Sequence, residues 1–113
     1  METAIEFKIK ATSACAKFSD CSPREQIQKI KEEVLEVEEA IEAFLKDGQT
    51  IEQKEAAAIK VLVEMYDVVA SVNTLHKQLV YRQPMYFHKE SRMIAESFVL
   101  NKNMARGYYA AEG

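Results

Sequence analysis

The sequence predicts an all-α protein, an antiparallel helical bundle of two long helices plus shorter helices. The chain of 113 residues contains only three Gly and two Pro, so few positions interrupt a helix. Two long segments carry apolar residues at helical spacing, and each follows a helix-start signal. This length suffices to bury a core without disulfides or metal ions, so we expect one domain over residues 1–113. Residues 1–21 are the one segment that we cannot place.

Charge, apolar runs and cysteine spacing argue against several classes of function. The net charge of −3 argues against nucleic acid as the main partner, because phosphate-binding surfaces usually carry a basic excess. No apolar run approaches 18 residues, so we expect no membrane segment. Cys15 and Cys21 lack the spacing of a metal site, and the start of the chain lacks the apolar region of a secretion signal. We therefore expect free thiols and a cytoplasmic protein.

The first half of the chain contains one unresolved segment and one clear helix. Residues 4–11 alternate apolar and charged side chains, which favours a strand, although a helix is also compatible. Ser22 is the expected N-cap of the first long helix, with Pro23 at its first position and Glu25 closing a capping box. We expect this helix to run to about Asp47 and to stop at Gly48.

A second long helix is expected to follow directly. Thr50 and Gln53 repeat the capping signature, so the helix begins at Ile51 and continues to about Tyr81. The short connection implies that the two helices are antiparallel neighbours. Pro84 breaks the chain, and a third helical segment is expected within residues 88–104.

Residues 59–75 are apolar around most of the expected helix but contain Glu64 and Asp67 on its narrow polar stripe. Such a helix is buried on most sides, so the acids are buried too or line a cleft. A buried carboxylate must be neutralised, paired or bound to a cation. An ion pair with Lys60 is one alternative, and a metal ion is the other. Because so little of this helix is polar, we also expect a second copy of the chain to cover part of it.

The first helix supplies acids that can face this pair. Packed antiparallel, the helices bring Glu33 and Glu36 opposite Glu64 and Asp67. An oxygen-only, strongly negative cage suits Mg²⁺ or Mn²⁺ and is poor for zinc, which prefers His and Cys. We therefore expect a metal-dependent phosphate chemistry in a helical bundle. For the first helix taken alone, a solvated acidic face is the alternative.

The two acidic pairs resemble a known motif. Glu33-x-x-Glu36, followed after twenty-seven residues by Glu64-x-x-Asp67, is similar to the motif of the MazG-like, all-α nucleoside triphosphate pyrophosphohydrolases. The segments KEEVLEVEEAIEAF and VEMYDVVASV resemble the surroundings of that motif. The closing NKNMARGYY resembles the Asn-x-x-Lys/Arg element of small members.

This resemblance implies Mg²⁺-dependent hydrolysis of a nucleoside triphosphate to the monophosphate and pyrophosphate, by a homodimer or homotetramer. Glu33, Glu36, Glu64 and Asp67 would hold the metal ions, and Glu32 is a candidate base. The implied contacts to phosphate come from the basic residues and one asparagine: Lys102, Asn103, Arg106 and, as a further candidate, Lys54. A phosphoribosyl-ATP pyrophosphatase and a non-catalytic helical interaction module are the alternatives.

Overall fold

The computed structural model describes residues 22–107, and these form three helices: α1 (Pro23–Phe44), α2 (Ile51–Arg82) and α3 (Lys89–Ala105). The described part of the chain contains no strand, which confirms the all-α prediction. The segment 4–11 and both cysteines lie outside these residues. The chain divides into two compact units, one ending at Gln78 and the other beginning at Leu79.

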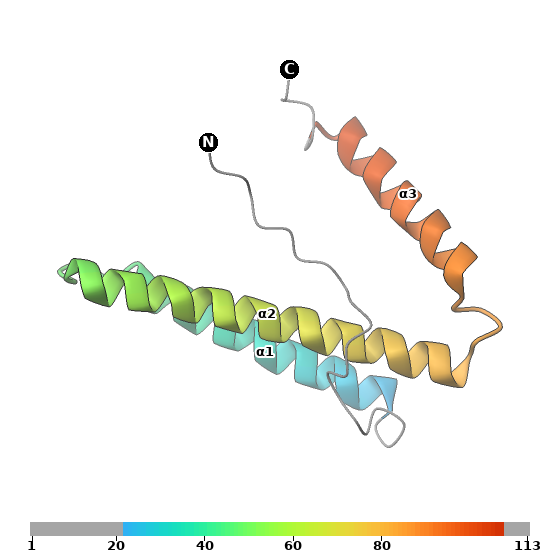
Figure 1. Ribbon diagram of the computed structural model, residues 1–113, viewed down its shortest axis with the longest axis horizontal. Coiled ribbons are helices and arrows are strands. Elements are labelled where there is room, and N and C mark those ends of the chain that lie inside the picture. Colours follow the sequence, from blue (N-terminus) through green and yellow to red (C-terminus); the bar gives the residue numbers. More distant parts are fainter. Residues whose placement is uncertain (1–21, 108–113) are drawn as a thin grey trace. The chain divides into compact units, whose positions relative to one another are not determined.

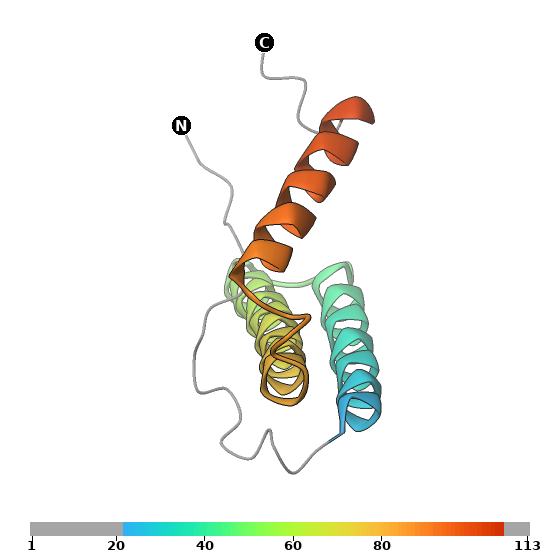
Figure 2. The same cartoon turned by 90° about the vertical axis from the view of Figure 1, so that its right-hand side faces the viewer.

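In the first unit, α1 and α2 lie side by side and antiparallel, joined by a short turn (Figures 1 and 2). The predicted start of α1 is confirmed. The Ser22 hydroxyl accepts the backbone N–H of Glu25 at 3.1 Å, and the Glu25 carboxylate accepts that of Ser22 at 2.8 Å. Farther along, the buried Gln26 side chain donates to the Ser71 carbonyl at 2.9 Å. The start of α1 therefore lies against the later half of α2.

The turn between the helices determines where α1 ends. Gln49 folds back and donates its side-chain amide to carbonyls near the end of α1, those of Ala43 at 3.0 Å and Lys46 at 2.7 Å among them. Gly48 has a φ of 81°, a conformation that glycine adopts without strain. The helix thus ends at Phe44, three residues before the predicted Asp47, and Gly48 belongs to the turn. The predicted start of α2 at Ile51 is confirmed.

The side chains buried in this unit are mostly polar. Ala40 is the one buried apolar residue among those described. On α2 the buried residues are Glu64, Ser71, Asn73, Thr74 and Gln78. Apolar residues of the same helix stay exposed, among them Ile59 and Val63. Two helices contact along one stripe of each, and on α2 the most buried residues are polar.

The second unit contains α3. The predicted third helix within 88–104 is confirmed, with bounds at Lys89 and Ala105. His88 is its N-cap, because the imidazole Nδ1 accepts the backbone N–H of Ser91 at 3.3 Å. Gly107 follows the C-cap with a φ of 83°. Within residues 22–107, no helix has both the length and the apolar character needed to cross a membrane.

Candidate metal centre

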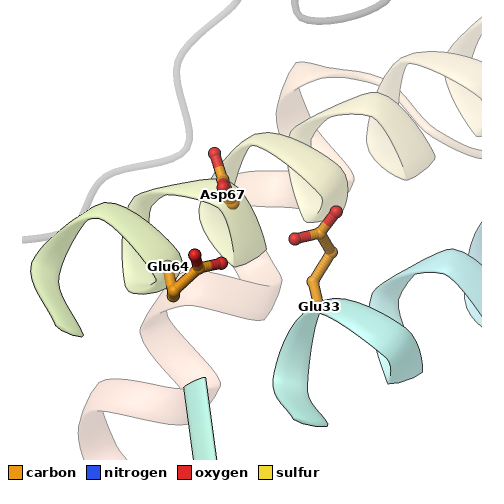
Figure 3. A group of neighbouring side chains, drawn as sticks. All are labelled: Glu33, Glu64 and Asp67. Carbon is orange, nitrogen blue, oxygen red and sulfur yellow. The ribbon is translucent and has the colours of Figure 1, made fainter. Parts of the chain in front are cut away.

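Three of the four predicted acids meet between α1 and α2. Glu33 rises from α1 toward Glu64 and Asp67 on α2 (Figure 3). One carboxylate oxygen from each of the three lies within 4.8 Å of the others. The antiparallel register explains why these acids meet. Gln26 on α1 pairs with Ser71 on α2. Glu33 follows Gln26 by seven residues and Glu64 precedes Ser71 by seven, so the two glutamates lie at the same level. Asp67 lies one turn along from Glu64 and on the same face.

The fourth acid, Glu36, borders this group. The Glu64 carboxylate would accept a hydrogen bond from a protonated Glu36, which favours that proton, and the nearby negative charge of Glu33 adds to the effect. Both raise the pKa of Glu36 above its usual range. The side chain itself is exposed. Three of the four predicted acids thus converge, with Glu64 buried and Asp67 exposed, and the exposed Glu36 borders this group.

Burial leaves two carboxylate oxygens without partners. Glu64 is only 5% exposed, and the Glu33 side chain only 13%. In each residue Oε1 is buried and has no hydrogen-bond partner. A buried acceptor that lacks a donor costs roughly 1–3 kcal/mol, and more when it is charged. These two oxygens therefore point to a ligand that supplies positive charge.

The other oxygen of each glutamate meets a lysine on its own helix. Glu64 Oε2 lies 2.7 Å from Lys60 Nζ, and Glu33 Oε2 lies 3.4 Å from Lys29 Nζ. The hydrogen bond from Lys60 lowers the pKa of Glu64, although burial acts against this. The same contact raises the pKa of Lys60. The Lys60 pair considered in the sequence is thus present, but it occupies only one of the two Glu64 oxygens.

These residues fit a hard divalent cation. All the donors are carboxylate oxygens, which suit Mg²⁺ and Mn²⁺, and three of them already converge. Glu36 and Asp67 are exposed, so water or substrate oxygens can also reach an ion held here. Mg²⁺ usually keeps several water ligands. Exposed acidic groups often bind no ion, so the two buried and unpartnered oxygens are the decisive feature.

The remaining predicted residues lie outside this cluster. Glu32 is exposed on α1, beside Glu33 in sequence. Lys54 lies in the first turn of α2, where its ammonium donates to the Phe44 carbonyl and lies 4.4 Å from the centre of the Phe44 ring. It precedes Glu64 by ten residues of α2, about 15 Å along the helix axis. The contact of Lys54 with phosphate stays a prediction, and the bond of its ammonium to Phe44 does not favour that contact.

The basic residues near the end of the chain belong to the second unit. Lys102 and Asn103 lie in the last turn of α3, and Arg106 is its C-cap. The backbone N–H of Arg106 donates to the Lys102 carbonyl at 3.1 Å. Their contact with substrate stays a prediction.

The sequence did not predict the roles of two further residues, Lys29 and Gln78. Lys29 precedes Glu33 by one turn, and its i,i+4 spacing was a usable signal. Gln78 is completely buried, and neither atom of its amide has a hydrogen-bond partner. It lies seven residues beyond Ser71 on the polar stripe of α2, so periodicity could have placed it there.

Comparison with known protein families, curated proteins and solved structures finds no match. The geometry of the acids and the motif that they form are therefore the features that indicate a function.

Proposed function

We propose that the protein is a Mg²⁺-dependent nucleoside triphosphate pyrophosphohydrolase, which converts a (d)NTP to the (d)NMP and pyrophosphate in nucleotide-pool house-cleaning in the cytoplasm. The observation that carries this proposal is the oxygen-only acid cluster on two facing helices, with one buried and unpartnered oxygen on Glu33 and another on Glu64. The likeness of the two acidic pairs to the MazG-like motif supports the same reaction.

Each acid has a role in this proposal. Glu33, Glu64 and Asp67 would hold the ion between the two helices, with Glu36 as a further carboxylate at the edge of the group. A divalent ion held there offsets negative charge on phosphate oxygens and makes a nearby water more acidic. The oxygen of the attacking water bonds to the α-phosphorus, and Glu32 accepts the proton that this water loses. The bond from that phosphorus to the pyrophosphate oxygen breaks, and pyrophosphate leaves. The likeness to the MazG-like enzymes assigns phosphate binding to Lys102, Asn103 and Arg106.

We also propose that the working form is a homodimer or homotetramer. On α1, Ile27, Val34 and Ile41 repeat every seven residues and are each about 40–50% exposed. Ile59, Val63 and Tyr66 form a second exposed stripe on α2. The described residues of this helical hairpin include a single buried apolar side chain, so a second copy would bury apolar surface that the hairpin leaves exposed.

The proposal is tested by incubating the protein with a panel of nucleoside triphosphates and Mg²⁺ or Mn²⁺, and by separating the products. We expect a monophosphate and pyrophosphate in equal amounts. Glu64→Gln should lower turnover by at least about a hundredfold, since even residues that only support metal ligands contribute 10–100-fold. Glu39→Gln, which removes an exposed acid elsewhere on α1, is the matched control and should keep its activity.

The outcome also decides among the alternatives. Selective hydrolysis of phosphoribosyl-ATP would assign the chain to that reaction. Release of orthophosphate instead of pyrophosphate would exclude attack at the α-phosphorus. Absence of both turnover and divalent-ion binding would leave a non-catalytic helical interaction module.

A further inference from the structure

The two helices present the same arrangement of charges toward each other. Each carries a lysine, a glutamate four residues later and a second acid three residues after that: Lys29, Glu33 and Glu36 on α1, and Lys60, Glu64 and Asp67 on α2. In both helices the lysine lies one turn before the glutamate with the buried, unpartnered oxygen.

Each lysine takes one oxygen of its glutamate and leaves the other. Lys60 Nζ contacts Oε2 of Glu64, and Lys29 Nζ contacts Oε2 of Glu33. In both glutamates the remaining oxygen, Oε1, is the buried and unpartnered one. The lysine side chains are themselves 64% and 60% exposed, so their ammonium groups are free to move to another partner.

Because the helices are antiparallel, the lysines flank the acid cluster at opposite ends. Lys29 precedes Glu33 along α1, whereas Lys60 precedes Glu64 along α2, which runs the other way. Each lies four residues from its glutamate, about 6 Å along the axis. An extended anion centred on the cluster would have one ammonium group near each of its ends.

We propose that Lys29 and Lys60 are exchangeable counter-ions of this site, a role that rests on the proposed function. Before a divalent ion binds, they neutralise Glu33 and Glu64. Once the ion takes over the glutamate charge, the two ammonium groups turn to the outer phosphate oxygens of the substrate.

The lysine–glutamate contacts are weak enough for each lysine to exchange its glutamate for a phosphate oxygen. In both pairs the lysine is largely exposed, and the i,i+4 order with lysine before glutamate is the weaker one. A divalent ion among three carboxylates attracts them far more strongly than a solvated ammonium group does. Phosphate oxygens then offer each lysine a charge-assisted hydrogen bond in place of the one that it loses.

The test compares Lys29→Gln and Lys60→Gln with the wild type by titration calorimetry, first with Mn²⁺ alone and then with pyrophosphate on the Mn²⁺-loaded protein. Loss of one competing positive charge should tighten Mn²⁺ binding about three- to tenfold. Loss of a phosphate contact should weaken pyrophosphate binding about tenfold. A lysine with a purely structural role would not produce tighter Mn²⁺ binding together with weaker pyrophosphate binding when it is replaced.

Lys31→Gln is the matched control, because it removes the same charge from an exposed position of α1 and should change both affinities less than twofold. Circular dichroism checks that each variant is folded. Mn²⁺ binding that is unchanged or weaker in both variants, or unchanged pyrophosphate binding, would overturn the exchange and leave the proposed function intact. A wild-type protein that binds no Mn²⁺ would overturn both.

Discussion

At the scale of single residues, the acid cluster makes stability depend on pH in a specific direction. Glu36 has a raised pKa because Glu64 and Glu33 lie beside it, so the folded protein holds this proton more tightly than the unfolded chain does. Stability from this group is therefore complete at low pH and declines as the pH rises through the folded pKa. Glu64 contributes in the opposite sense, since its lowered pKa adds stability that is lost as the pH falls.

Glu36→Gln should accordingly raise the melting temperature of the metal-free protein by a few degrees at pH 7 and leave it unchanged near pH 4. The reason is that the amide removes a negative charge that the wild type bears only at the higher pH. Thermal unfolding followed by circular dichroism at both pH values measures this. Glu39→Gln is the control, and an equal shift for both variants would show that net charge, not the cluster, is responsible.

Gln78 provides a second prediction at this scale. Its amide donor and acceptor are both buried and unpartnered, so replacing it by a hydrophobic side chain of similar size removes a desolvation cost. Gln78→Leu should raise the free energy of unfolding by about 1–3 kcal/mol in urea titration. Gln28→Leu, at an exposed position of α1, should change it little. A less stable Gln78→Leu protein would mean that the amide has a partner, such as an ordered water.

At the scale of elements, side chains hold the turn between α1 and α2. Gln49 donates to carbonyls at the end of α1, and Lys54 donates to one of them while its ammonium lies over the Phe44 ring. These contacts satisfy backbone acceptors that every helix end leaves open. They set the end of α1 and thereby help to hold the register in which Glu33 meets Glu64.

Gln49→Ala should therefore cost about 1–2 kcal/mol of stability, because carbonyls at the end of α1 lose their donor. It should also weaken Mn²⁺ binding, since the register of the acids loosens. Urea unfolding and calorimetric titration measure the two effects. Gln53→Ala disrupts the neighbouring cap of α2 and is the comparison. Loss of stability with unchanged Mn²⁺ affinity would show that the register does not depend on this turn.

At the scale of the whole molecule, the exposed apolar stripes predict self-association. Val34 on α1 and Val63 on α2 are each 48% exposed, and Val34→Lys and Val63→Lys place a charge in these apolar stripes. Light scattering coupled to gel filtration should show a dimer or tetramer for the wild type and a smaller species for both variants, because a buried lysine opposes association. Gln28→Lys adds the same charge at an exposed polar position and should leave the assembly unchanged. A monomeric wild type would contradict the prediction.

Much of this organisation was predictable from local chemistry. Ser22 with Glu25, and Thr50 with Gln53, mark where the two long helices begin, because a cap depends on neighbours three residues apart. The stripe that holds Glu64 and Asp67 follows from helical periodicity alone. The end of α1 was predicted three residues too late, because Gln49 satisfies the last carbonyls from the turn and Gly48 does not cap the helix directly.

The sequence by itself determined the helices, their caps and the face that carries each acid, since all of these depend on residues within a turn or two of one another. Only the tertiary structure decided that Glu33 meets Glu64 and Asp67, that one oxygen of each glutamate is left without a partner, and that Lys54 serves the turn. Those results depend on the register between two helices. Register follows from the sum of contacts along the whole interface, which no single stretch of sequence contains.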